Sequence, residues 1–267
     1  MCDHCVIEAV KDRMLSRRAM LGAGAAAAAL PLATAPARAA AHGAPVDMTH
    51  TLSPSFPTFG GGPGIATEKV FDFASDGYNL LHLTIEEHSG THIDAPLHFS
   101  ADGTSVDRIP VENLVCPLAV IDIAAKAEAD PDAQVVPEDV TAWTDANGPI
   151  PDGACVAMFS GWAAKVGTEA FRGADADGGL HFPGFHPDAT AMLLETGAAA
   201  IAVDTLSLDH GPSADFATHY AWLPAGRYGI ECLAGLDTMP ATGATLVVGA
   251  PKHEGGTGGP ARVIALT

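Results

Sequence analysis

Short apolar runs separated by glycine and proline set the pattern of this chain after residue 40. These runs predict β-strands at Leu80–Ile85, Leu118–Ile123, Val156–Phe159, Ala200–Val203, Leu246–Val248 and Val263–Leu266. The 29 glycines and 20 prolines are dispersed rather than clustered. Dispersed turn-forming residues favour many turns and few helices.

Two segments carry the signals that start and stop helices. One is expected to begin near Pro137, with Glu138 and Asp139 in its first turn. The other is expected from Pro187 to Thr196, stopped by Gly197, with Met192, Leu193 and Leu194 facing inward. Many strands with few helices predict a single α/β domain on a strongly curved or barrel-like sheet.

The first 39 residues predict an export signal rather than part of the fold. Ser16-Arg17-Arg18-Ala19-Met20-Leu21 opens an alanine-rich apolar run, and Ala37-Arg38-Ala39 follows as a small-x-small cleavage site. This arrangement is typical of twin-arginine export to the periplasm or the exterior. The Cys2-Asp3-His4-Cys5 cluster would leave with the signal. The functional domain is therefore expected at residues 40–267, without a stable membrane anchor.

The charge of this remainder limits its partners. Of 13 basic and 32 acidic residues, 5 and 3 lie within residues 1–39, so residues 40–267 carry a formal net charge of −21. Such a surface repels nucleic acid and anionic lipid. Three cysteines remain, and two of them, Cys116 and Cys155, lie in apolar runs. Cys232 completes an odd number, so three buried thiols are expected rather than a disulfide framework.

The strongest chemical signal is the string from His88 to His98. Eleven residues hold three histidines, His88, His92 and His98, and one carboxylate, Asp94. Imidazole and carboxylate are ligand types that Zn²⁺ and Mn²⁺ accept. In a straight strand the string would span roughly 33 Å at about 3.3 Å per residue. One site therefore requires a kinked loop that folds around a point. The alternative is a polar turn with hydrogen-bonded histidines.

The eleven residues resemble the signature of the cyclase superfamily of metal-dependent hydrolases, which includes bacterial kynurenine formamidase and isatin hydrolase. Weaker matches follow in the family's order at Asp47–Ser53, Phe182–Gly184, Val203–Asp209 and Pro260–Arg262. The resemblance implies a kynurenine formamidase-like swivelling β/β/α fold: a curved, barrel-like mixed sheet with flanking helices. It also implies hydrolysis of an amide C–N bond and assembly as a homodimer or larger homo-oligomer.

The resemblance implies two divalent ions per chain, Zn²⁺ or Mn²⁺. The implied metal ligands are His88, His92, Asp94, His219 and Glu231, with Asp94 bridging the two ions. His98 matches the catalytic histidine. Asp204 and Asp209 could orient metal-bound histidines or be ordinary turn carboxylates. Glu86 and Glu87 are expected to serve hydrogen bonds in a strand, and Gly255–Pro260 is expected to form a turn before the last strand.

Three aromatic residues are the candidate walls of the substrate site. Phe59 stands where the family's formamidases often carry tryptophan, and Tyr220 and Trp222 follow His219. A small, partly aromatic substrate is therefore expected. The export signal and Phe59 both argue against formylkynurenine, the substrate of tryptophan catabolism, so an aryl formamide or a cyclic amide such as isatin remains.

Metal-activated water with proton transfer by His98 is the expected mechanism. No Gly-x-Ser-x-Gly motif is present to suggest a nucleophilic serine. Two alternatives stay open from sequence: hydrolysis of a lactone or other cyclic ester at the same metals, and an exported metal-binding protein without turnover. His98 argues against the second, because a storage site needs no additional histidine.

Overall fold

A computed structural model describes residues 43–267 of the chain. The predicted export signal and Cys2–Cys5 lie outside the described residues. Within the described part, no helix is long and apolar enough to cross a bilayer.

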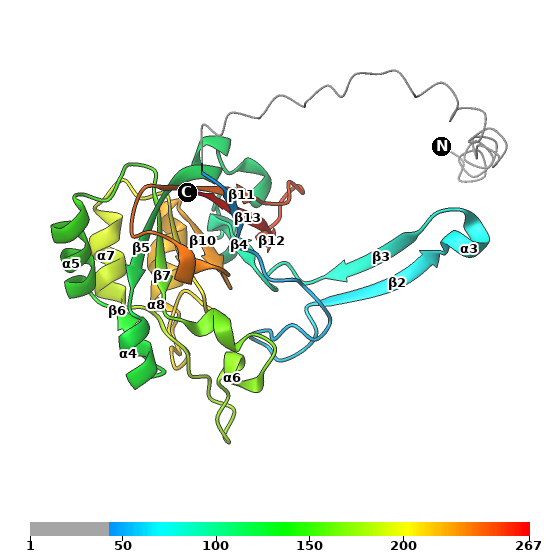
Figure 1. Cartoon of the computed structure of the whole chain (residues 1–267), viewed down its shortest axis with the longest axis horizontal. Coiled ribbons are helices and arrows are strands. Elements are labelled where there is room, and N and C mark those ends of the chain that lie inside the picture. The colour runs from blue at the N-terminus through cyan, green and yellow to red at the C-terminus, as the bar shows by residue number, and fades with distance from the viewer. Residues whose placement is uncertain (1–42) are drawn as a thin grey trace, which may run out of the picture. The chain divides into compact units, whose positions relative to one another are not determined.

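A nine-stranded mixed sheet forms the centre of the larger compact unit, residues 43–66 and 85–267 (Figure 1). Its strand order is β1 (Pro45–Asp47), β13 (Arg262–Leu266), β11 (Ala244–Gly249), β5 (Val115–Asp122), β7 (Cys155–Phe159), β9 (Ala200–Val203), β10 (Tyr228–Glu231), β4 (His92–Asp94) and β12 (Gly258–Pro260). The four strands from β5 to β10 run parallel to one another, and the remaining pairings are antiparallel.

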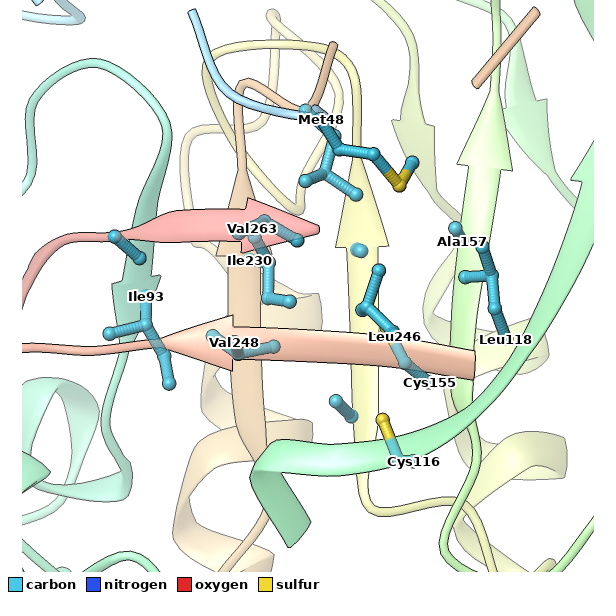
Figure 2. Close-up of a cluster of buried hydrophobic side chains, with 14 of the residues drawn as sticks. Met48, Ile93, Cys116, Leu118, Cys155, Ala157, Ile230, Leu246, Val248 and Val263 are labelled. Atoms are coloured by element: carbon cyan, nitrogen blue, oxygen red, sulfur yellow. The ribbon is translucent and has the colours of Figure 1, made fainter. Parts of the chain in front are cut away.

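The sheet curls so that its two ends enclose one core. Leu246 and Val248 of β11 lie in the same buried cluster as Ile93 of β4 and Ile230 of β10 (Figure 2). In the sheet, β11 and β10 are separated by three strands, so flat strands could not bring these side chains together. This curvature is the predicted barrel-like sheet.

Side chains of different size occupy the two faces of the central strands. Alternate residues of a strand point to opposite faces. On β9, the small Ala200 and Ala202 face the enclosed core, whereas Ile201 and Val203 face the helices. Small residues inside and branched residues outside suit a sheet that bends inward, and burial of both faces explains why the runs are continuously apolar.

Helices cover the outer face of the sheet. Outside residues 67–84, the described helices are α4 (Ala124–Ala129), α5 (Pro137–Asn147), α6 (Glu169–Arg172), α7 (Pro187–Leu194) and α8 (Ala217–Trp222), with 3₁₀ turns η1 (Pro96–Phe99), η2 (Val106–Arg108), η3 (Val111–Leu114), η4 (Trp162–Lys165), η5 (Leu223–Ala225) and η6 (Leu236–Thr238). A short parallel pair, β6 (Gln134–Val135) with β8 (Gly184–Phe185), completes this layer. Trp143 of α5, Leu193 of α7 and Trp222 of α8 bury against the sheet.

The expected helices begin where proline and the acidic residues predicted. Helix α5 starts at Pro137, and the Asp139 side chain accepts a 2.8 Å hydrogen bond from the backbone N–H of Val136. Helix α7 starts at Pro187 and ends at Leu194. Leu193 is buried and Leu194 packs against the same core, as expected. Met192 is 36% exposed, so the expectation that it faces inward is wrong.

The remaining sequence expectations for the core hold. Every predicted strand is present, and β3 spans Leu80–Ile85 as expected. Cys116, Cys155 and Cys232 are all buried free thiols. Burial raises the pKa of each thiol.

A β-hairpin forms a separate compact unit at residues 67–84. It pairs β2 (Ile65–Phe71) with β3 and turns through the short helix α3 (Phe73–Asp76). The Asp72 side chain caps this helix by accepting from the backbone N–H of Ala74. The hairpin exposes large apolar side chains, namely Phe73, Leu80, Leu81 and Leu83.

Candidate metal centre and active site

The register between β4 and β10 assembles the centre of the site. His92 lies opposite Glu231, and Asp94 lies opposite Gly229. His92 and Asp94 therefore share one face of β4, while Ile93 between them points into the enclosed core. A Cβ at position 229 would come within 2.7 Å of Leu208 and 3.4 Å of the Asp94 Oδ2 atom. Glycine leaves that space open beside the carboxylate.

Gly90 produces the kink that the sequence required. It adopts a left-handed φ of 65°, between His88 and the start of β4. The turn brings His88 back so that its Nδ1 atom lies 2.6 Å from Asp94 Oδ1. The string thus folds around Asp94.

The helix α8 supplies His219 from the other side of the same carboxylate. Its Nε2 atom lies 3.5 Å from Asp94 Oδ2 and 3.2 Å from Glu231 Oε1. Asp209 orients it by accepting from His219 Nδ1 at 2.6 Å and from the backbone N–H of Thr218 at 2.8 Å. Asp209 therefore holds both the helix start and the histidine ring.

The five residues that the sequence proposed as ligands thus lie together, in two groups that share one carboxylate. The first group is His88, His92 and Asp94, and the second is Asp94, His219 and Glu231; within each group the candidate ligand atoms lie within 4.8 Å of one another.

Unpartnered buried atoms show that this cluster fits a cation. His92 donates Nδ1–H to the Gly90 carbonyl at 2.8 Å, which leaves its Nε2 atom buried with no hydrogen-bond partner. Asp94 Oδ2 is likewise buried without a hydrogen-bond donor. Buried polar atoms without partners are costly, and a divalent ion bound by imidazole and carboxylate would satisfy both.

The electrostatics of the cluster also favour added positive charge. Burial alone would lower the pKa of His92, but the Asp94 and Glu231 carboxylates raise it to about 9. Burial and the neighbouring Asp94 charge raise the pKa of Glu231. Burial would also raise the pKa of Asp94, but the positive charge of His92 holds it well below its ordinary value. Two buried carboxylates so close together require protons or a metal cation.

His98 lies beside the cluster without belonging to either ligand group. It comes from the 3₁₀ turn η1, and its ring stacks on His88 with centroids 3.7 Å apart. Burial lowers the pKa of His98 to about 4, so the imidazole is neutral near pH 7 and can accept a proton.

A cavity of about 260 Å³ opens onto this cluster. Its apolar walls are Phe59, Phe99, Phe216 and Leu206, and its polar lining includes His88, His92, His98, His219 and Glu231. Phe216 contacts both Phe59 and Phe99, at centroid distances of 5.9 and 5.7 Å, so the three rings form one continuous aromatic wall. A cavity of this size and lining suits a single small aromatic molecule.

The aromatic wall differs in part from the sequence expectation. Phe59 lines the cavity as proposed, but neither Tyr220 nor Trp222 is among the lining residues. Tyr220 is 62% exposed, and its ring packs edge-to-face with Phe99 at a centroid distance of 4.9 Å. Trp222 is fully buried among the core residues and donates its Nε1–H to the Tyr228 carbonyl at 2.8 Å.

Phe99 and Phe216 line the cavity in place of Tyr220 and Trp222, and the sequence did not identify either of them as a wall residue. Phe99 immediately follows His98, and Phe216 precedes His219 by three residues, so nearness to ligand residues was the available signal. Phe216 has a left-handed φ of 50° and Cys232, also in the lining, has a φ of 55°. Strained non-glycine backbone of this kind concentrates at functional sites.

The two aspartates left open by the sequence have different roles. Asp209 holds His219, as described above. Asp204 instead accepts from the Ser160 hydroxyl at 2.5 Å and from the backbone N–H of Trp162 at 3.0 Å. Asp204 therefore organises a turn of the fold and contacts none of the five proposed ligands through these bonds.

Comparisons with known proteins agree with this geometry. A family model described as "Putative cyclase" matches residues 46–210. Isatin hydrolase of Roseibium aggregatum is 33% identical over 240 residues, covering 83% of this chain and 90% of that protein. Kynurenine formamidase of Salinibacter ruber is 30% identical over 190 residues, covering 70% of this chain and 79% of that protein.

Solved structures give the same relationship. A crystal structure of an isatin hydrolase bound to the product analogue thioisatinate superimposes with a TM-score of 0.80 at 30% identity, covering 95% of this chain and 99% of that one. Isatin hydrolase A from Labrenzia aggregata, bound to benzyl benzoate, gives 0.79 at 36% identity over 84% and 93% of the two chains. With its metal-ligand cluster, curled sheet and matched signature, this chain belongs to the cyclase family of metal-dependent hydrolases.

Proposed function

We propose that this metal-dependent hydrolase of amide C–N bonds opens the lactam ring of isatin or a closely related cyclic amide. The observation that carries the proposal is the wall formed by Phe59, Phe99 and Phe216 over the two ligand groups. A flat bicyclic ring can lie against such a wall while its carbonyl faces the metal centre. The isatin hydrolases similar to this chain support the same choice of substrate.

We further propose two divalent cations per chain, Zn²⁺ or Mn²⁺, at the two groups that share Asp94. His88, His92 and Asp94 would hold one ion, and Asp94, His219 and Glu231 the other. Bound divalent ions would supply an acidified water and polarise the substrate carbonyl. Metal analysis after full reconstitution tests the number, since a content fixed at one ion per chain would contradict it.

The side chains divide the reaction between binding and proton transfer. The aromatic wall binds and orients the ring. His98, neutral at pH 7, accepts the proton that the attacking water loses as its oxygen bonds to the lactam carbon. The same proton passes to the ring nitrogen as the C–N bond breaks, which yields an arylamine and a carboxylate.

A hydrolysis screen of the reconstituted enzyme tests the substrate. We expect turnover of isatin, weaker turnover of formanilides, and little of aliphatic lactones. Preference for formanilides would favour the aryl-formamide alternative, which the similarity to a kynurenine formamidase supports. Preference for lactones, or no turnover after metal loading, would contradict the proposal.

Assembly as a homodimer is also proposed. Leu81 and Leu83 of β3 lie on one face of the hairpin and are 49% and 54% exposed. A lone two-stranded hairpin with an open apolar face is at best marginally stable, and a two-fold dimer is the commonest way to cover such a surface. Sedimentation velocity should give a dimer for the native chain and a monomer for the double variant Leu81→Ser and Leu83→Ser.

Export by the twin-arginine pathway remains the proposed localisation. The paired arginines and the Ala37-Arg38-Ala39 site support it. Expression with Arg17 and Arg18 replaced by lysine should retain the unprocessed protein in the cytoplasm. N-terminal sequencing of exported native protein should begin at Ala40.

A further inference from the structure

The Nε2 atom of His88 contacts a residue far along the sequence, Thr257. Thr257 Oγ1 lies 2.9 Å from His88 Nε2, and Thr257 also donates its hydroxyl to Glu87 Oε2 at 2.5 Å. The backbone N–H of Thr257 reaches the same carboxylate oxygen at 3.2 Å. The second oxygen of Glu87 contacts His253. The chain Glu87–Thr257–His88 therefore ends on a proposed metal ligand.

The directions of these hydrogen bonds follow from the chemistry of the groups. The backbone N–H of Thr257 can only donate, so Glu87 Oε2 accepts from it, and a glutamate carboxylate is ordinarily ionised near pH 7. An ionised carboxylate only accepts, so the Thr257 hydroxyl must donate its proton to Glu87. The Thr257 oxygen is then free to accept from His88, which requires the proton of His88 to be on Nε2.

We propose that Glu87 and Thr257 are positioning residues that hold His88 in the tautomer needed to bind metal through Nδ1. With the proton on Nε2, the lone pair of Nδ1 faces Asp94 Oδ1 across 2.6 Å. Two acceptors at that distance repel each other unless a cation lies at the site. Hydrogen bonds of this kind to a ligating histidine fix its tautomer and orientation.

The backbone around Thr257 is built for this contact. Its carbonyl accepts from the N–H of Ala95 at 2.8 Å, directly after Asp94, so Thr257 is anchored to the end of β4. The next residue, Gly258, pairs with Asp94, and a Cβ there would come within 2.7 Å of the His88 ring. Glycine at 258 thus allows the Thr257 segment to approach the imidazole. The segment Gly255–Pro260 was expected to be a turn, but its last three residues form strand β12, and Thr257 before them supplies a group to the candidate site.

The inference rests on the proposed metal site but not on the identity of the substrate. It is tested by the affinity of the metal-free protein for Zn²⁺, measured by competition with a chromophoric chelator. Thr257→Val and Glu87→Gln should each weaken Zn²⁺ binding by about 10–100-fold. Thr257→Ser keeps the hydroxyl and should bind Zn²⁺ within about twofold of the native protein.

A matched control separates this role from general loss of a threonine hydroxyl. Thr49 exchanges hydrogen bonds with the backbone of Val263 in β13, away from His88. Thr49→Val should lower thermal stability while leaving Zn²⁺ affinity unchanged. In long-range ¹H–¹⁵N spectra of the Zn²⁺-loaded protein, His88 should carry its proton on Nε2.

Three results would overturn the inference. If Thr257→Val bound Zn²⁺ as tightly as the native protein, the Thr257 hydroxyl would have no role in metal binding. If Thr257→Ser bound Zn²⁺ as weakly as Thr257→Val, the role of Thr257 would be packing alone. A His88 ring protonated on Nδ1 in the loaded protein would reverse the tautomer. A native protein that binds Zn²⁺ tightly but hydrolyses no isatin would contradict the proposed substrate and leave the affinity comparison intact.

Discussion

The two halves of the candidate site are built differently. Three of the metal-site residues, His92, Asp94 and Glu231, lie on paired strands and are at most 5% exposed. The aromatic wall comes from connecting segments: Phe59 lies in a loop and is 37% exposed, and Phe216 lies just before α8 in a left-handed conformation. The sheet positions the chemistry, whereas the loops shape the space for the substrate.

This difference predicts which substitutions affect which property. A metal ligand on a β-strand is held in place by cross-strand hydrogen bonds. Substituting such a residue should therefore remove metal and activity together. An aromatic residue in a loop can be substituted with less effect on the fold. Its substitution should therefore alter substrate binding and leave the metal in place.

The largest expected effect is that of His92→Ala. This substitution removes a buried ligand and leaves Asp94 and Glu231 facing each other, so metal should be lost and hydrolysis should fall to the uncatalysed background. Metal content by mass spectrometry and initial rates measure this. His186→Ala, at the exposed N-terminus of α7, is the control and should retain both properties. Full metal content in His92→Ala would remove His92 from the ligand set.

His98→Ala should separate proton transfer from metal binding. We expect both ions and the fold to remain while kcat falls by about 10²–10⁴-fold, the range for a placed acid–base group. Metal content and steady-state kinetics on the same preparation decide the matter. Loss of metal would make His98 a ligand, and a near-native kcat would exclude a catalytic role.

Trp222→Ala tests whether this ring belongs to the core rather than to the wall. Because the indole is fully buried and hydrogen-bonded to Tyr228, its truncation should cost about 3–5 kcal/mol of unfolding free energy. The folded fraction should keep native KM. Urea denaturation gives the first quantity and kinetics the second. A raised KM with little loss of stability would return Trp222 to the substrate site.

The smallest effect is expected at Phe59. Phe59→Ala should raise KM for isatin by about 2–12-fold, corresponding to the loss of an aromatic contact of about 0.5–1.5 kcal/mol, with metal content unchanged. Tyr220→Ala is the matched control, since that ring does not line the cavity, and its KM should stay within about twofold of native. Equal effects of the two substitutions would contradict the described wall.

The sequence revealed much of the metal site because several ligands are neighbours along the chain. Four polar residues between His88 and His98 and the glycine that bends them are local features, and their chemistry is visible without a fold. The apolar runs likewise identified the strands, because the parallel strands at the centre of the sheet are buried on both faces.

The tertiary structure decided what depends on distant contacts. His219 is oriented by Asp209 only because α8 begins on that carboxylate. Thr257 reaches His88, 169 residues earlier in the sequence, only because β12 pairs with β4. Trp222 was misplaced for the same reason: its closeness to His219 in sequence says nothing about which face of α8 it occupies. Residue type and spacing determine which chemistry this chain can perform, whereas helix phase, strand register and the curl of the sheet determine which side chains reach the cavity.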